Sequence, residues 1–226
     1  MRPVRFQTAD GLSLVCEVHE AEGHARGSAV ICHPHPRHGG SKDHPLLWAI
    51  RGALVRRGLT VLAFNFRGIM GSEGTFGSGV DEIEDVRAAV GRVRQSASGP
   101  TLAVGWSFGA SVALREAVQD RRVAALALVG FPLSETSLHL PPPPGRDELA
   151  ALGRPVLFVV GQADQFSPLP ELRRLARRIP GSEIAVIPDT DHFFWKREKE
   201  VADRIGAFAD AVLAGWAPDG GGTLGT

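Results

Sequence analysis

Short apolar runs alternate with helical patterns from Ser28 onward, and this alternation constrains the fold more than any other feature of the sequence. The run Val156–Val160 is apolar at every position, as expected of a strand covered by helices on both faces of a parallel sheet. The pattern predicts eight strands, at Val4–Gln7, Leu12–His19, Ala29–Cys32, Thr60–Phe66, Leu102–Gly105, Ala125–Val129, Val156–Val160 and Glu183–Ile187. The first two alternate in polarity, which favours an antiparallel hairpin at the sheet edge.

Helices are expected where apolar residues recur at spacings of three and four. These segments are Leu46–Arg57, Glu82–Arg94, Phe108–Gln119, Leu169–Arg178 and Glu198–Ala214. The order of elements predicts an α/β fold, a three-layer αβα sandwich around a mostly parallel sheet. Between the sixth and seventh strands, the segment Pro132–Arg154 contains four consecutive prolines. It is too short and too rich in proline for a large cap domain, so a site beside it is expected to be open.

The length of 226 residues and the hydrophobic content of 43% suit one domain with a substantial core. We expect this domain to span residues 1–216, and the glycine-rich residues 217–226 to form a disordered tail. Lysine plus arginine and aspartate plus glutamate both number 25, so no net positive field favours nucleic acid. The balance of charge therefore predicts no nucleic acid partner.

The first residues of the chain, Met1–Gln7, lack the apolar stretch of a secretory signal, and no apolar run approaches the ~20 residues of a membrane helix. We therefore expect a cytoplasmic protein without a membrane partner. Cys16 and Cys32 both lie in apolar strand segments, which predicts two buried thiols rather than a disulfide.

The segment Gly105-Trp106-Ser107-Phe108-Gly109 lies directly after a predicted strand and directly before a predicted helix. A strand that turns sharply into a helix forces its apex residue into a sparsely populated backbone conformation, and flanking glycines remove side chains that would clash. This arrangement is typical of a nucleophile elbow, which projects a serine hydroxyl out of the sheet. An ordinary strand-to-helix loop is the alternative, and the position on the fold favours the elbow.

Two further residues follow predicted strands, in the chain order serine, acid, histidine. Asp164 follows Val156–Val160, and His192 follows the last strand after a short loop. Functional groups collect where parallel strands end, so both are expected at the same sheet edge as Ser107. An imidazole can take the serine proton during attack, and a carboxylate on its other nitrogen can orient it. Ser107, His192 and Asp164 are therefore our candidate nucleophile, base and acid.

A tetrahedral intermediate needs hydrogen-bond donors for its oxyanion. The backbone N–H of Phe108 is one candidate, because it begins the helix after the elbow. The loop after the third strand, which contains His35, should supply the other. Pro34 and Pro36 have no N–H, so His35 is the predicted donor.

The sequence resembles small, lidless bacterial α/β-hydrolases related to dienelactone hydrolases and short carboxylesterases. The resemblance covers nearly the whole chain and rests on the elbow and on His33-Pro34-His35-Pro36, Gly39-Gly40, Phe64–Gly68, Gly71–Gly74, Gly161–Asp164 and Asp191–Phe194. It implies acyl hydrolysis, usually of esters, without a cofactor. Dienelactone hydrolases proper carry cysteine where this chain has Ser107, which disfavours that particular substrate. Haloalkane dehalogenases carry aspartate there, which disfavours carbon–halogen cleavage.

Four aromatic residues flank these positions and are candidates for an apolar substrate pocket: Trp106, Phe108, Phe166 and Phe194. Phe108 is favoured among them because it adjoins the candidate nucleophile. For Asn65 and Arg67, at the end of the fourth strand, a structural role is favoured, with the arginine tying loops together through backbone carbonyls.

The leading hypothesis is hydrolysis of small-molecule carboxylic esters through an acyl-enzyme on Ser107, by a monomer or a homodimer. Amide, peptide or thioester cleavage would use the same residues. From another class, a metal site could be built on His33, His35, His38 and His44, but second-shell partners are not evident. A non-catalytic scaffold is the third reading, disfavoured because all three candidate residues are present.

Overall fold

The predicted strands form one sheet with the order β1-β2-β4-β3-β5-β6-β7-β8 in the computed structural model, which describes residues 4–133 and 140–216. The strands are β1 (Val4–Gln7), β2 (Ser13–His19), β3 (Gly27–Cys32), β4 (Leu59–Phe64), β5 (Thr101–Trp106), β6 (Ala125–Val129), β7 (Val156–Gly161) and β8 (Glu183–Ile187). β1 and β2 form the predicted antiparallel edge hairpin, β2 also pairs antiparallel with β4, and all other pairs are parallel. The mostly parallel eight-stranded sheet is therefore confirmed.

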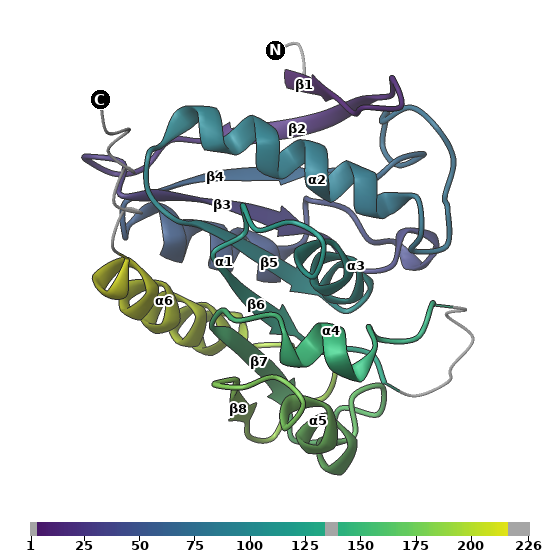
Figure 1. Cartoon of the computed structure of the whole chain (residues 1–226), viewed down its shortest axis with the longest axis vertical. Helices are drawn as coiled ribbons and strands as arrows, with labels where there is room; N and C mark the ends of the chain where they lie inside the picture. The colour runs from purple at the N-terminus through teal and green to yellow at the C-terminus, as the bar shows by residue number, and fades with distance from the viewer. Residues whose placement is uncertain (1–3, 134–139, 217–226) are drawn as a thin grey trace, which may run out of the picture.

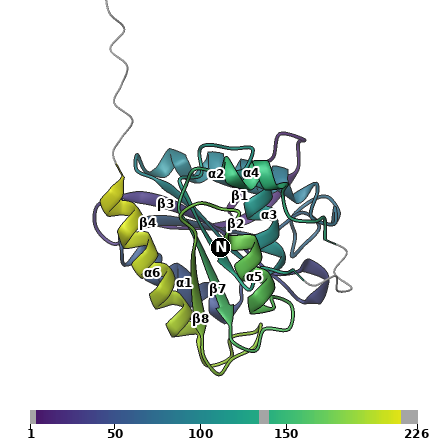
Figure 2. The same ribbon diagram turned by 60° about the horizontal axis from the view of Figure 1, so that its bottom comes forward.

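Helices cover both faces of the sheet (Figures 1 and 2). They are α1 (Pro45–Val55), α2 (Glu82–Val93), α3 (Phe108–Ala117), α4 (Arg146–Ala150), α5 (Leu169–Ala176) and α6 (Glu198–Gly215). α1 and α6 pack together on one face, and α2, α3 and α5 lie on the other. The three-layer αβα sandwich is thus confirmed. The sequence did not predict α4, because five residues give too little periodicity to detect.

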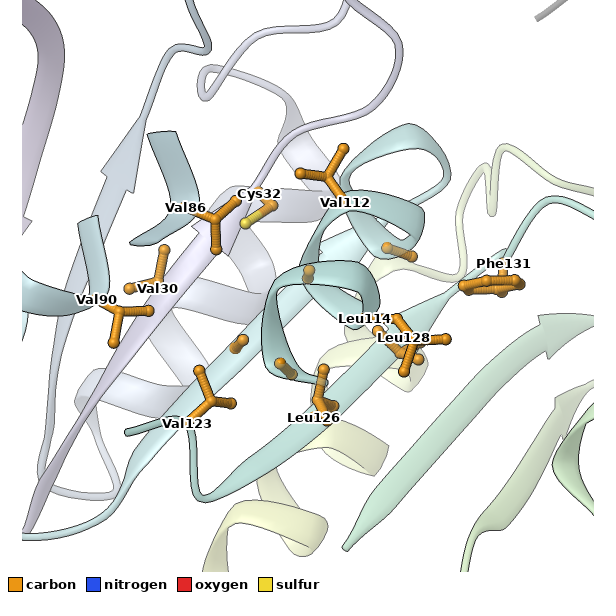
Figure 3. Close-up of a cluster of buried hydrophobic side chains, with 14 of the residues drawn as sticks. Val30, Cys32, Val86, Val90, Val112, Leu114, Val123, Leu126, Leu128 and Phe131 are labelled. Atoms are coloured by element: carbon orange, nitrogen blue, oxygen red, sulfur yellow. The ribbon is translucent and has the colours of Figure 1, made fainter. Parts of the chain in front are cut away.

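Apolar side chains fill the space between the sheet and each helical layer. Figure 3 shows part of the cluster beneath α2 and α3, where Val86 and Val112 face Val30 and Cys32 of β3. Cys16 and Cys32 are both buried and unpaired with each other, as predicted. The central strands β3, β4, β5, β6 and β7 are buried at every position, which explains why nearly all of their residues are apolar.

The connection from β6 to β7 holds only the short helix α4 among its described residues, which confirms that this part of the chain has no large cap domain. Within residues 4–133 and 140–216, no helix is long and apolar enough to cross a bilayer. The tail predicted at 217–226 lies outside the described residues.

Arg67 ties the end of β4 to α2 and to the β1–β2 turn. Its Nε donates to Asp85 Oδ1 at 2.9 Å, and its Nη1 donates to Asp10 Oδ2 at 3.0 Å. Asn65 Oδ1 accepts a hydrogen bond from the backbone N–H of Lys42 at 2.9 Å. Both residues connect loops, but the expected carbonyl partners of Arg67 were wrong. Buried Asp85 supplies a full negative charge to the guanidinium, which a carbonyl cannot do.

Candidate active site

Ser107 occupies the apex between β5 and α3, with φ 54° and ψ −116°. This backbone conformation is sparsely populated for a residue with a side chain, so the surrounding structure must hold it. The Ser107 N–H donates to Val129 O on β6 at 2.8 Å. A Cβ added at Gly105 would collide with the carbonyl oxygen of Gly109, and one added at Gly109 would collide with Cys32 O. The glycines of the motif therefore allow the tight strand-to-helix turn.

Asp164 lies in the loop that follows β7, with its side chain fully buried. Its Oδ1 accepts hydrogen bonds from the backbone N–H groups of Phe166 at 2.9 Å and Ser167 at 3.0 Å. Both donors belong to the same loop as Asp164, so this loop by itself holds the carboxylate in place. Ala163 N–H donates to Thr190 O at 3.0 Å and joins this loop to the one after β8.

His192 comes from the loop after β8 and meets the Asp164 carboxylate. Its Nδ1 lies 2.9 Å from Oδ2 and 3.0 Å from Oδ1, and its side chain is 6% exposed. Trp106 Nε1 donates to the His192 carbonyl oxygen at 3.3 Å. Gly130 follows β6 with φ +52°, and a Cβ there would lie 3.0 Å from His192 Cε1 and Nδ1. A glycine at this position thus makes room for the histidine–aspartate pair.

A cavity of about 320 Å³ lies at this edge of the sheet. Its lining contains Ser107 and His192 together with Pro34, His35, His38, His44, Trp106, Phe166, Phe193 and Trp195. The structure therefore brings the candidate nucleophile and the candidate base to one cavity, with Asp164 buried behind the histidine.

The loop after β3 packs against the start of α3. A Cβ at Gly40 would collide with Pro34 O and lie 2.7 Å from His35 O, so glycine permits the tight loop. His35 begins a 3₁₀ turn at Pro36–His38 and lines the cavity. Phe108 is the first residue of α3, where a backbone N–H has no acceptor within its own helix. Both predicted oxyanion donors thus lie beside the cavity edge at which Ser107 is held.

Of the predicted substrate-pocket residues, Trp106 and Phe166 line the cavity. The structure does not bring Phe194 or the Phe108 side chain there, because both are fully buried in the two cores on opposite faces of the sheet. Both residues were expected in the pocket because they lie close in sequence to Ser107 or His192, and that expectation was wrong. Phe194 has φ 54°, which turns it inward while its neighbour Phe193 is 41% exposed.

Sequence reasoning missed Pro34, Phe193 and Trp195 as lining residues, and considered His38 and His44 only as metal ligands. Phe193 directly follows His192 in the sequence, and this adjacency was the signal that could have identified it as a lining residue. Trp195 carried no signal of its own, because its placement depends on the conformation of a loop.

The histidines of the proposed metal site have structural partners instead. His33 Nδ1 lies 2.7 Å from Pro34 O, and its Nε2 accepts from Phe66 N–H at 3.1 Å. Complete burial lowers the pKa of His33 to about 4, so the ring is neutral. His44 Nδ1 accepts from Leu46 N–H and caps α1. Within the part of the chain that the structure describes, no group of three or more His, Cys, Asp or Glu residues is arranged to hold a metal ion.

A strained serine at a strand-to-helix apex, beside a histidine–aspartate pair at the carboxyl edge of a mostly parallel sheet, defines the class of the α/β hydrolases. Comparison with protein families agrees, since the family described as alpha/beta hydrolase domain matches residues 28–214. The chain belongs to this family. That membership supports hydrolase activity.

Two solved structures share the fold over nearly their whole length, and one further protein is similar in sequence. A serine hydrolase homologue from Coxiella burnetii is 27% identical, with a TM-score of 0.78 over 92% of this chain and 96% of that one. A serine hydrolase without a lid from Xanthomonas campestris is 25% identical, with a TM-score of 0.79 over 96% of each chain. An uncharacterized protein of Rickettsia prowazekii is 26% identical over 196 residues, which are 83% of this chain and 80% of that protein.

Proposed function

We propose that this chain is a serine hydrolase that cleaves carboxylic esters of small molecules through an acyl-enzyme on Ser107. One observation carries the proposal. Ser107 and His192 line the same cavity, and the Nδ1 of His192 lies 2.9 Å from the buried carboxylate of Asp164. A histidine oriented in this way has its Nε2 available to exchange a proton with the serine and the substrate. The similarity to the serine hydrolase homologue of Coxiella burnetii and to the lidless serine hydrolase of Xanthomonas campestris supports the same class of reaction.

In the first half of the reaction, Ser107 Oγ attacks the ester carbonyl carbon while His192 Nε2 takes the hydroxyl proton. The carbonyl electron pair moves to the oxygen, which accepts hydrogen bonds from the backbone N–H groups of Phe108 and His35. Asp164 stabilises the imidazolium through Nδ1–H. When the carbonyl re-forms, the bond to the alcohol oxygen breaks, and His192 returns its proton to that oxygen. The alcohol leaves and the acyl group stays on Ser107.

In the second half, a water molecule repeats the attack. His192 takes one proton from the water as its oxygen bonds to the acyl carbon, and then gives that proton to Ser107 Oγ as the acyl–serine bond breaks. The products are a carboxylic acid and the free enzyme. Each proton that His192 accepts is delivered within the cycle, so no cofactor is needed.

The test uses a fluorophosphonate probe, with the modified residue located by peptide mass spectrometry. We expect labelling at Ser107, loss of labelling in S107A, and at least a hundredfold slower labelling in H192A, in line with general-base contributions of about 10²–10⁴. Ser111, a buried serine one turn further along α3, provides the matched control, and S111A should be labelled normally. Turnover of 4-nitrophenyl acetate should follow the same order.

Two results would contradict the proposal. One is undiminished ester turnover in folded S107A, and the other is the absence of both labelling and turnover in the folded wild-type protein. A thioester and an anilide matched to the ester test which bond the protein prefers. Faster turnover of either one would make that substrate class, rather than the ester, the proposed substrate.

A further inference from the structure

The cavity beside Ser107 has an aromatic wall that runs from the core to the surface. Trp106 is 3% exposed, and its ring centroid lies 4.5 Å from that of His44. The His44 ring lies in turn 6.2 Å from that of Trp195, which is 62% exposed. All three residues line the cavity. A ligand that enters the cavity therefore meets flat ring faces and edges along this side.

Further rings surround the imidazole of His192. The centroid of Phe166 lies 4.7 Å from that of His192, and the centroid of Phe193 lies 5.7 Å from it. Both phenylalanines line the cavity, and Phe193 is 41% exposed. The space next to His192 is thus bounded by aromatic side chains from two different loops. Exposed aromatic side chains at a cavity mouth favour a partner that covers them.

The wall carries no fixed charge. Among the described residues that line the cavity, none is a lysine, arginine, aspartate or glutamate. Partial burial lowers the pKa of His44, so its imidazole is neutral at neutral pH. A charged substrate group would lose water here without gaining an opposite charge, which is unfavourable. The cavity therefore favours uncharged groups.

The proposed reaction fixes which part of an ester lies near these rings. His192 must deliver its proton to the leaving oxygen, so that oxygen must come within hydrogen-bonding distance of the imidazole. The group carried by the leaving oxygen then extends into the space beside His192, where Phe166, Phe193 and the Trp106–Trp195 wall lie. The carbonyl oxygen is directed instead toward the oxyanion donors.

We propose that the preferred substrates are uncharged esters of aromatic alcohols, whose leaving-group ring packs against this aromatic wall. This inference rests on the proposed ester hydrolysis at Ser107. Edge-to-face and offset-stacked ring pairs are stabilised beyond their buried area, so an aromatic ring binds here better than a saturated ring of the same carbon number.

The first experiment compares kcat/KM for benzyl acetate and cyclohexylmethyl acetate, which differ only in the saturation of the alcohol ring. We expect benzyl acetate to be preferred by about three- to tenfold, the range that aromatic pairs supply. Methyl phenylacetate, an isomer of benzyl acetate with its ring on the acyl side, is compared with methyl cyclohexylacetate. This second ratio should be smaller. Equal ratios for the two pairs, or no preference for benzyl acetate, would overturn the inference.

Variants then locate the preference. W195A should remove most of the benzyl preference, measured as the ratio of kcat/KM for benzyl acetate to kcat/KM for cyclohexylmethyl acetate. Trp216 is the matched control, since it is 39% exposed at the end of α6 and outside the cavity lining. W216A should keep the full preference. An unchanged preference in W195A would contradict the assignment of the wall.

A binding measurement separates this inference from the proposed function. Calorimetry of S107A with benzyl acetate and with cyclohexylmethyl acetate reports the ring preference without any hydrolysis. If wild-type protein cleaves no ester, the proposed function fails and the calorimetry alone decides the inference. Tighter binding of benzyl acetate that is lost on adding W195A supports the aromatic wall, and equal affinities contradict it.

Discussion

Replacing Gly130 with alanine should disturb the histidine–aspartate pair while both of these residues are kept. The added Cβ would lie 3.0 Å from both Cε1 and Nδ1 of His192 and 3.3 Å from Oδ2 of Asp164. Gly130 N–H also donates to Val159 O at 2.8 Å, so the backbone is held by β7 and cannot easily withdraw. The imidazole must therefore move.

Two magnitudes follow from this geometry. Ordinary contact with a Cβ begins near 3.4 Å, so His192 must shift by about 0.4 Å. Because a misplacement of about 1 Å can cost a hundredfold in rate, a shift of this size should lower kcat/KM by roughly tenfold. Separately, Gly130 has φ +52°, where a residue with a side chain costs about 1–2 kcal/mol. G130A should therefore also lose about that much free energy of unfolding.

Gly181 allows the two effects to be measured apart. It has φ +75°, and a Cβ there would meet nothing within 4 Å. G181A should lose a similar free energy of unfolding in urea, about 1–2 kcal/mol, and keep wild-type kcat/KM for 4-nitrophenyl acetate. The reasoning would be refuted if G130A retained full activity, or if G181A lost activity to the same extent. Fluorophosphonate labelling rates for both variants provide an independent readout.

Two other predictions concern buried ionisable side chains away from the cavity. Glu116 on α3 is fully buried, the Arg87 Nε lies 4.0 Å from its Oε1, and burial raises its pKa to about 9. An ionised carboxyl is then disfavoured in the folded state, so the free energy of unfolding of the wild type should fall relative to that of E116Q as the pH rises from 5 to 9. The fall should be at most about 1.4 kcal/mol per pH unit in urea unfolding. Parallel curves of unfolding free energy against pH for the two proteins would contradict this. R67M should lose about 3–5 kcal/mol of its free energy of unfolding, because it leaves Asp85 buried without its ion-pair partner. The double variant R67M/D85N should recover much of that loss. Equal stability of R67M and R67M/D85N would argue against the ion pair.

The strands and long helices were predictable because their signals are local. Val156–Val160 is apolar throughout, since β7 is covered on both faces, whereas β1 lies at the sheet edge and buries only Phe6 among its four residues. The order of the chain also predicted that Asp164 and His192 would reach one sheet edge, because parallel strands end there together. The distance of 2.9 Å between His192 Nδ1 and Asp164 Oδ2 follows from that placement and from the hydrogen bonds inside each loop.

The cavity wall was less predictable because it depends on loop conformation. Phe193, Phe194 and Trp195 are consecutive, yet the middle residue is buried in the core and its neighbours line the cavity. Phe194 also has a positive φ, and the presence of a phenylalanine in a sequence does not predict a positive φ. His38 and His44 were grouped with other histidines by spacing, whereas their packing against aromatic rings needs the folded loop.

The contacts at Gly109 bring the first turn of α3 against the main chain of Cys32 and His33, where β3 ends and the following loop begins. No side chain stands between these two segments at those points, so their separation does not depend on the volume of any neighbouring residue. Substitutions can therefore change the rings of the cavity wall, and with them the leaving group that is recognised, while the spacing between the backbone N–H groups of His35 and Phe108 stays constant. Recognition and reaction geometry are free to change at different rates in descendants of this chain.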